Sequence, residues 1–431
     1  MKNKILQITK KPFVQNVIIL TSGTAGAQLV AMLLSPIITR LYGPDAYGMM
    51  GTFTAIITII TPLAALTYPM AIVLPKKDSD AKGLIRLSLL ISSLIAAIAF
   101  LILVFFSDYI VGLLQLNTYS YLLYLIPFVI LFLGILQVSE QWLIRKKLFT
   151  VSAKATFSQA IFINGGKVVA GFFYPVAHIL LFFSSLKPGI NALFMLFFAK
   201  YLSKKKITAL FCNKVSIKKL AKKYKDFPSF RTPEMLLSSF SGDLPIILLS
   251  ILFGPASAGF YSIGRTVLNV PTILISKSVG DVFYPRISEA ANNKEILAKL
   301  ILRATLLLCL IGIIPYGTVI ILGPWIFEFV FGEEWLIAGE YARWIAFWAF
   351  FSFINRPSVR SLPVLSAQRF HLIYTIITLI VRVLALFTGF YVFQNDLVAV
   401  ALFGVFGALM NIGLVLITLL ISRRYDNRSK N

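Results

Sequence analysis

The amino-acid sequence predicts an all-α membrane protein with about twelve transmembrane helices, arranged as two parallel-repeat bundles of six helices each. Three observations lead to this fold class. The 431 residues are 58% hydrophobic and only 13% charged, whereas about a quarter of the residues in a soluble domain are charged. Lysine and arginine concentrate in alternate loops between apolar segments. A short motif containing glycine and proline occurs once in each half of the chain.

Twelve apolar segments are long enough to cross a bilayer, for which a helix needs about 20 residues. They are 14–41, 45–74, 84–106, 120–143, 155–175, 177–200, 232–253, 258–284, 300–323, 336–355, 370–392 and 397–421. Prolines inside these segments, such as Pro62, Pro69 and Pro271, predict bends in the helices. The basic start, Met1–Lys11, is not expected to be a cleavable signal peptide, because the apolar stretch after it is too long and lacks an Ala-x-Ala site.

The distribution of basic residues predicts the orientation in the membrane. All but seven of the 41 lysines and arginines lie on one side, in alternate loops or just inside the adjoining spans. The loops on the other side carry acids such as Asp45 and Glu333, and no lysine or arginine. Cytoplasmic loops carry the basic excess, so both termini are expected in the cytoplasm. The chain itself is expected in the inner membrane. Nucleic acid is not an expected partner, because no nucleic-acid motif accompanies the net charge of +24.

The longest loop divides the chain near its middle. We expect three parts: an N-terminal six-helix lobe over 1–203, a basic amphipathic linker over 204–231, and a C-terminal six-helix lobe over 232–431. One face of the linker is apolar at helical spacing, and five lysines cover much of the rest. The apolar positions are Ile217, Leu220, Ala221 and Tyr224. Such a helix could lie on the anionic inner leaflet or form a solvated linker whose charge sets topology.

An internal repeat supports the division into two halves. The segment 41–48, Leu-Tyr-Gly-Pro-Asp-Ala-Tyr-Gly, aligns with 252–259, Leu-Phe-Gly-Pro-Ala-Ser-Ala-Gly. At nearly the same offset of roughly 210 residues, Pro75-Lys76 aligns with Pro285-Arg286. Each first element would turn the chain at the outer surface, and each second would end the next span at the cytoplasmic side. Matching elements on matching faces predict a parallel repeat, in which the halves rock to give alternating access.

Seven basic residues lie inside the predicted spans or at their outer ends. They are Arg40, Lys167, Lys187, Arg265, Lys277, Arg343 and Arg382. A charge near the bilayer centre costs about 2.5–3.5 kcal/mol on insertion scales. Seven such charges indicate a wet, positively charged cleft and an anionic substrate, with arginine suited to bidentate contacts with phosphate. Arg265, Lys167, Arg382, Lys187, Arg343 and Arg40 are therefore the candidate substrate-binding residues.

Some intramembrane charges have alternative explanations. Arg40 could instead extend to the outer surface, and Lys277 could extend inward or pair with Asp281. Asp243, near the middle of the seventh span, could be the counter-ion of a central base or an ion-coupling site for protons or sodium. Which of these side chains face the cleft depends on helix rotations that the sequence does not determine.

Nothing in the sequence indicates an enzyme. The outer loops are too short to hold an active site, and the inner ones lack clustered carboxylates for acid–base chemistry. The two cysteines, Cys212 and Cys309, fall in a loop and a span, so neither a disulfide nor a metal site is expected. The isolated His178 and His371 are interpreted as interfacial side chains. No catalytic residue, metal or cofactor is expected.

Several segments resemble the Wzx-type polysaccharide or O-antigen flippases of the MOP (MATE-like) exporter superfamily, over nearly the whole chain. Residues 35–48 resemble the signature after that family's first span, and Ala71-Ile72-Val73-Leu74-Pro75-Lys76 resembles its second. Trp142-Leu143-Ile144-Arg145 with Phe149 is similar to the end of its fourth span. The segments 226–228, 252–255 and 283–286 are similar to the start of its second half.

The resemblance implies a V-shaped transporter of twelve helices with a cationic lumen. Its members move undecaprenyl-diphosphate-linked oligosaccharides, such as O-antigen or capsule repeat units, from the inner to the outer leaflet of the cytoplasmic membrane. Expected partners are the lipid-linked oligosaccharide and membrane lipid, and they could include a polysaccharide polymerase and a chain-length regulator. Lumenal arginines of related lipid II flippases bind a diphosphate, and Arg265 is the candidate for that role here.

Two other functions compete with this hypothesis. A MATE-like multidrug or organic-cation antiporter on the same scaffold would need acidic or aromatic sites at mid-membrane, and the excess of bases argues against it. A membrane polymerase or glycosyltransferase would need a sizeable domain with acids or bases, and it would have no use for a repeat of six spans plus six.

Overall fold

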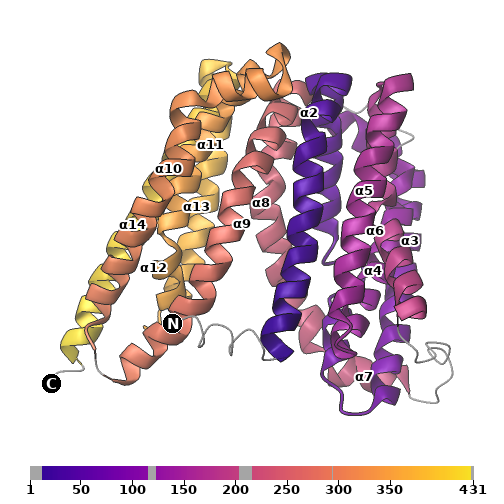
Figure 1. Cartoon of the computed structure of the whole chain (residues 1–431), viewed down its shortest axis with the longest axis horizontal. Helices are drawn as coiled ribbons and strands as arrows, with labels where there is room; N and C mark the ends of the chain where they lie inside the picture. Colours follow the sequence, from indigo (N-terminus) through magenta and orange to yellow (C-terminus); the bar gives the residue numbers. More distant parts are fainter. Residues whose placement is uncertain (1–11, 115–122, 203–215, 294, 429–431) are drawn as a thin grey trace. The chain divides into compact units, whose positions relative to one another are not determined.

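The computed structural model describes residues 12–114, 123–202, 216–293 and 295–428, and within these ranges the chain is helical with no β-strand (Figure 1). The chain divides into two compact units, Met1–Ile251 and Leu252–Asn431. The boundary between the units falls after the expected linker. Most of α8 (Thr232–Phe253) therefore belongs to the first unit, although the sequence predicted it in the C-terminal lobe.

The first unit is built from long helices and short connecting turns. Its elements are α2 (Pro12–Ile60), η1 (Tyr68–Val73), α3 (Asp78–Leu114), α4 (Ile126–Arg145), α5 (Phe149–Phe173), α6 (Ala177–Leu202), α7 (Ile217–Lys223), η3 (Phe227–Arg231) and α8. The expected break between the fifth and sixth spans is present, because α5 ends at Phe173 and α6 begins at Ala177.

The second unit repeats this construction. Its elements are α9 (Pro255–Asn292), α10 (Leu297–Phe331), η4 (Glu333–Trp335), α11 (Leu336–Ile354), α12 (Arg356–Ser361), α13 (Gln368–Thr388), η5 (Gly389–Phe393) and α14 (Asp396–Arg428). At the start of α10, the backbone N–H groups of Leu297 and Ala298 donate to the buried carboxylate of Asp426 from α14, at 2.9 and 3.0 Å. This contact satisfies donors that a helix start leaves open.

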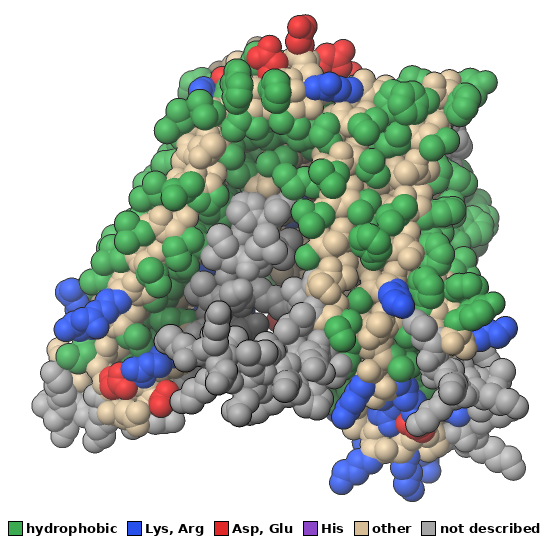
Figure 2. Space-filling view, viewed as in Figure 1, with side chains coloured by type: hydrophobic (Ala, Val, Ile, Leu, Met, Phe, Trp, Pro, Cys, Tyr) green, Lys and Arg blue, Asp and Glu red, His purple; other side chains and the backbone are tan. Residues whose placement is uncertain are grey.

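Eight helices in the described part of the chain are long and apolar enough to cross a membrane. Their apolar side chains face outward rather than into a core: only 17% of the most apolar window of α3 is buried, and Phe105 and Ile314 are about three-quarters exposed. Figure 2 shows hydrophobic side chains along the helices, with basic side chains gathered at the end of the first unit where Figure 1 places α7. An apolar surface this extensive requires lipid around it.

The two copies of the repeated motif share one backbone conformation. Gly43 has φ 69° and ψ 174°, and Gly254 has φ 94° and ψ 172°. This region is open essentially to glycine alone. In both copies, the helix that follows begins with proline, whose fixed φ suits the first helical position. The continuous α2 is therefore two helices broken at Gly43, as the repeat predicts.

The second predicted span, 45–74, is wrong in its last part. The helix ends at Ile60, and the chain continues through turns into the short helix η1. Leu66 and Thr67 both take positive φ, near 50°, which is incompatible with a right-handed helix. Apolar composition predicted a continuous helix here, whereas Pro62 and the left-handed residues end it.

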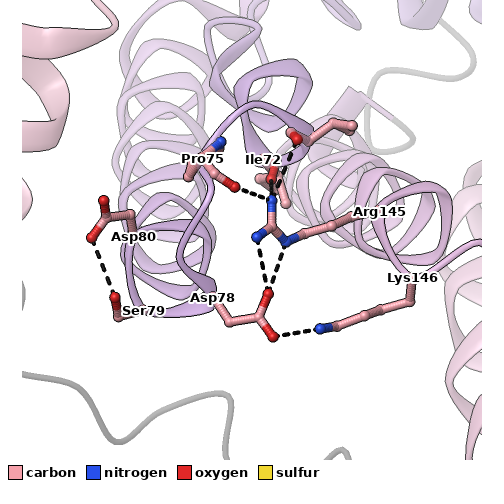
Figure 3. Close-up of polar contacts among 8 residues, drawn as sticks. Ile72, Pro75, Asp78, Ser79, Asp80, Arg145 and Lys146 are labelled. Carbon is pink, nitrogen blue, oxygen red and sulfur yellow. Dashed lines mark hydrogen bonds and ion pairs between the residues drawn. The ribbon is translucent and has the colours of Figure 1, made fainter.

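Arg145, the last residue of α4, joins two segments on which the family resemblance depends (Figure 3). Its Nη1 donates to the carbonyl oxygens of Ile72, Val73 and Pro75, at 3.1, 3.3 and 2.7 Å. Its Nε and Nη2 both reach Oδ1 of Asp78, at 3.1 and 2.9 Å. A single guanidinium thus supplies partners for two backbone carbonyls at the end of η1 and one just after it, and it neutralises a carboxylate at the start of α3.

The helix α7 does not expose its apolar face. Leu220 is buried in a cluster with residues of η1 and α3, and Ile217, Ala221 and Tyr224 pack against the same cluster. Tyr68 donates its hydroxyl hydrogen to the carbonyl of Ala221 at 3.2 Å. The face predicted from the sequence is correct, but its partner is the first unit rather than the bilayer. The five lysines of this region are exposed.

A salt bridge closes the turn between α9 and α10. Arg286 Nη2 lies 2.6 Å from Glu295 Oε2, and hydrogen bonding from this guanidinium lowers the pKa of the Glu295 carboxyl below its usual value. Both side chains are about 40% exposed, so the pair is worth little in stability.

Candidate functional site

A polar cavity of about 230 Å³ lies within the second unit, among α11, α12, α13 and α14; we call it the C-terminal cavity. Its lining includes the basic side chains of Arg356, His371 and Arg382, and none of its lining residues is acidic. Membrane helices seldom bury polar groups without a functional reason. The C-terminal cavity is therefore the candidate site for an anionic ligand.

Arg382 is held between two aromatic rings. Its guanidinium carbon lies 4.2 Å from the ring centroid of Trp348 on α11 and 3.8 Å from that of Phe403 on α14. Such cation–π contacts stabilise a charge removed from water. Because the rings occupy space beside the guanidinium, its N–H groups have few protein partners. Its Nε is buried and makes no hydrogen bond.

The position of Arg382 depends on a glycine of α14. A Cβ at Gly407 would lie 2.6 Å from Cδ1 of Trp348 and 3.1 Å from Nε of Arg382. Any side chain there would push apart the ring and the guanidinium. Gly407 is thus a positioning residue, and its role could not be recognised without the fold.

One face of α13 supplies the remaining polar wall. His371, Tyr374, Thr375, Thr378 and Arg382 all line the cavity and recur at spacings of three and four residues, which places them on one helix face. From His371 to Arg382 the stripe extends about 16 Å along the helix axis. This pattern was present in the sequence, but only Arg382 was singled out there, and His371 was interpreted as interfacial.

Lys167 is the predicted site residue most deeply buried in the first unit. Its side chain on α5 donates to Ser184 Oγ of α6 and Met50 Sδ of α2, both at 3.1 Å, and it is only 7% exposed. Tyr42 donates to its backbone carbonyl at 2.7 Å. The exposed Lys187 lies near enough for the two charges to repel. These contacts lie within the first unit, and whether Lys167 also lines a cleft stays a prediction.

The remaining predicted residues lie in different environments. Arg265 on α9 is partly buried and near enough to Arg382 for their charges to repel. Arg343 on α11 pairs with Glu340 at 3.1 Å and donates to the carbonyl of Ile321, so its charge is already used within the unit. Arg40 is exposed, and Asp243 on α8 is buried. The side chains of Lys277 and Asp281 lie outside the described part of the chain.

Asn355 and Asn411 are functional candidates that the sequence reasoning missed. Nδ2 of Asn355 donates to Oδ1 of Asn411 at 2.9 Å, and Nδ2 of Asn411 donates to the carbonyl of Gly407 at 2.8 Å. Asn355 is 3% exposed, and its Oδ1 has no partner. Little in the sequence indicates them, because Asn355 ends a predicted span and neither residue is charged.

A model of the polysaccharide biosynthesis protein family matches residues 37–339. No curated protein sequence matches the chain. Solved structures share its fold: the lipid II flippase MurJ in an inward closed conformation has a TM-score of 0.71 at 17% identity, with 94% of this chain and 90% of that chain covered. An inward-facing multidrug resistance MATE family transporter of the MOP superfamily has a TM-score of 0.68 at 14% identity, covering 94% and 95%.

A third structure, from Pyrococcus furiosus, has a TM-score of 0.57 at 13% identity and covers 98% of this chain and 97% of that chain. It is described as a MOP superfamily transporter in which the reverse polarity of the binding pocket suggests a different function. The chain therefore shares its fold with these transporters and with the flippase, and its eight long apolar helices are those of a multi-pass membrane protein.

The chain belongs to the family of polysaccharide biosynthesis proteins, because the family model covers well over half of its length. The all-α fold class and the MOP resemblance predicted from the sequence are confirmed.

Proposed function

We propose that this protein is a flippase that moves a lipid-linked oligosaccharide, such as an undecaprenyl-diphosphate-linked O-antigen or capsule unit, between leaflets of the bacterial inner membrane. It would do so by alternating access of its two lobes, expected over 1–203 and 232–431 and joined by the linker 204–231. Both termini would lie in the cytoplasm. A polymerase and a chain-length regulator are the proposed protein partners.

The C-terminal cavity is the observation that carries this proposal. A sugar chain cannot cross hydrocarbon without polar groups to replace its water, and the cavity offers a hydroxyl- and amide-bearing wall on helices that are expected to span the membrane. The two arginines of its lining, Arg356 and Arg382, favour an anionic substrate. The family is one of polysaccharide biosynthesis, and a lipid II flippase shares the fold.

Arg265 is the proposed contact for the diphosphate, beside Arg382. Lys167, Lys187, Arg343 and Arg40 remain proposed contributors to the cationic path, and Asp243 is the proposed ion-coupling residue. For Arg343, the ion pair with Glu340 means that a substrate would have to displace a carboxylate, so we rank it last.

A MATE-like multidrug or organic-cation antiporter is the alternative, supported by the shared fold. The basic, acid-free lining of the C-terminal cavity argues against it, because a cation would be repelled by Arg382 and Arg356. A drug-resistance assay with and without overexpression separates the two, since only an antiporter would raise resistance.

Complementation of a deletion strain tests the proposed function. We expect cells without the protein to display no glycan units outside and to accumulate the lipid-linked precursor inside. The Arg265→Glu variant, which reverses one charge, is expected to abolish export while leaving the amount of protein in the membrane unchanged. Full export by this variant would remove Arg265 from the mechanism. Display of single units by the deletion strain would indicate a polymerase instead.

A further inference from the structure

Three hydroxyl groups lining the C-terminal cavity have donated their hydrogens within the protein and remain acceptors. Thr375 and Thr378 donate their hydroxyl hydrogens to the carbonyls of His371 and Tyr374, both at 2.8 Å, and Tyr374 donates its own to the carbonyl of Met410 at 2.8 Å. A hydroxyl that has donated its hydrogen still has lone pairs to offer. These three hydroxyls therefore remain as acceptors for a ligand, while Trp348, Ser352 and Asn411 of the same lining carry N–H or O–H groups.

Asn355 extends the same pattern into the buried part of the cavity. One N–H of its amide donates to Asn411, whereas its Oδ1 is buried without a partner. Buried polar atoms are nearly always hydrogen-bonded in native proteins, so an unpaired one needs an explanation. Because this atom is closed off from solvent, it adds an acceptor behind the cavity wall rather than a direct contact for a ligand.

The charged groups of the cavity are donors only. Arg382 has a buried, unpartnered Nε and is held by Trp348 and Phe403. The exposed Arg356 stands at the start of α12 on the same cavity. Guanidinium groups bind carboxylate or phosphate oxygens in a bidentate manner. With no acid in the lining, the anion must come from the ligand.

We infer that the C-terminal cavity is a sugar subsite specific for an acidic sugar, a ring bearing a carboxylate together with several hydroxyl groups. The carboxylate would accept from the guanidinium of Arg382, and the ring hydroxyls would donate to Thr375 and Thr378. A volume of about 230 Å³ is below that of typical drug-sized sites, so the cavity suits one sugar unit rather than a whole oligosaccharide.

Simpler ligands satisfy only half of this lining. A neutral sugar would meet the acceptors and leave the charge of Arg382 unpaired, which is costly in a desolvated site. Inorganic phosphate would pair with the arginines and leave most of the acceptors without a donor. A sugar phosphate and a sugar carboxylate share this anionic chemistry, and glucose 1-phosphate and glucuronate distinguish them as probes.

This inference rests on the proposed function in one respect: it makes the acidic sugar a component of the transported glycan. It thereby names a substrate class, glycans containing a uronic acid or a similar acidic sugar. Binding of the sugar to the cavity can be measured without transport.

The test is protection of a cysteine placed in the cavity of the full-length protein. In a background with Cys212→Ser and Cys309→Ser, Thr378→Cys is labelled with a maleimide in lipid nanodiscs, and the rate is measured against increasing sodium glucuronate, glucose, glucose 1-phosphate or sodium phosphate. Thr375→Cys, at a more exposed position on the same wall, serves if the first cysteine reacts too slowly or that variant misfolds.

We expect glucuronate to halve the labelling rate at a concentration at least tenfold lower than glucose or phosphate requires. Protection by glucuronate that is no better than that by glucose, or equalled by phosphate, would overturn the inference. Stronger protection by glucose 1-phosphate than by glucuronate would also overturn it, since the site would then prefer a phosphate to a carboxylate.

Arg382→Gln in the same background is expected to remove the preference for glucuronate over glucose. The matched control is Arg231→Gln, which removes an exposed arginine paired with Glu234 in the first unit and should leave the preference intact. If complementation shows export but glucuronate gives no protection, only this inference fails. If glucuronate protects but the deletion strain exports normally, the proposed function fails and the sugar site stands.

Discussion

Arg382 shows how a single charge becomes usable inside a membrane. Two rings stabilise the guanidinium, Gly407 leaves room for them, and the Nε remains without a protein partner. The sequence singles out Arg382 because a charge interrupts an apolar segment. It could not reveal Gly407 or Asn355, whose importance arises only from packing between helices that are distant in the sequence.

Gly407→Ala tests this positioning at the residue scale. The added methyl would meet Trp348 and Arg382 at distances that require a shift, so we expect glucuronate protection at Thr378→Cys to weaken about tenfold. Overpacking of this kind costs about 1–3 kcal/mol of stability, which thermal unfolding would report separately. Gly317→Ala is the control, because open space surrounds its Cβ position. Unchanged protection in Gly407→Ala would show that the guanidinium does not depend on this packing.

Arg145→Lys is a second residue-scale prediction. Lysine keeps the charge but cannot contact three carbonyls and Asp78 together, so the segment after η1 loses hydrogen bonds that it had from the guanidinium. We expect a loss of about 2 kcal/mol in the free energy of unfolding, measured by thermal unfolding in detergent. The control is Arg231→Lys. Arg231 pairs with Glu234, which a lysine can also reach, so stability should change little. Equal stability of the two variants would contradict this explanation of why the two family-like segments meet.

At the scale of elements, the repeat is a matter of backbone conformation as well as sequence. Gly43 and Gly254 reach nearly the same φ and ψ before a proline that starts the next helix. The sequence predicted both turns because glycine followed by proline has few alternatives. The sequence-based prediction was wrong over 61–74, where two residues of an apolar run take left-handed conformations. Local composition does not indicate such conformations.

Gly254→Ala tests the turn without a steric complication, because nothing lies within 4 Å of the added Cβ. The backbone strain alone should cost about 1–3 kcal/mol, and we expect the unfolding temperature to fall accordingly. Gly165→Ala, a helical glycine with equally open surroundings, should stabilise slightly or not at all. A Gly254→Ala variant as stable as the parent would show that the turn can adopt another conformation.

The helix α7 gives another prediction at this scale. Leu220→Asp would bury a carboxylate in the cluster with η1 and α3, which we expect to release α7 at a cost of about 2–4 kcal/mol. Hydrogen exchange over 217–231 would then rise. Lys219→Asp, on the exposed face of the same helix, is the control for added negative charge. Equal exchange in the two variants would contradict the docking of α7 on the first unit.

For the whole molecule, composition determined more than any motif. The low charged fraction and the one-sided lysines and arginines predicted a multi-pass helical protein, and the family and the solved structures confirm that class. The candidate site was predicted less completely. A charge in an apolar segment is visible in the sequence, whereas the cavity around it is formed by four helices whose rotations the sequence does not give.

Translocation by the purified protein tests the central claim, that basic groups at membrane depth bind an anionic glycan for transport. Liposomes containing the protein would be supplied with a fluorescent polyprenyl-diphosphate-linked oligosaccharide bearing an acidic sugar, and movement between leaflets would be followed by chemical quenching. We expect rapid movement with the parent protein and with Arg231→Gln, and at least tenfold slower movement with Arg382→Gln. Equal rates for the parent and Arg382→Gln would contradict the account.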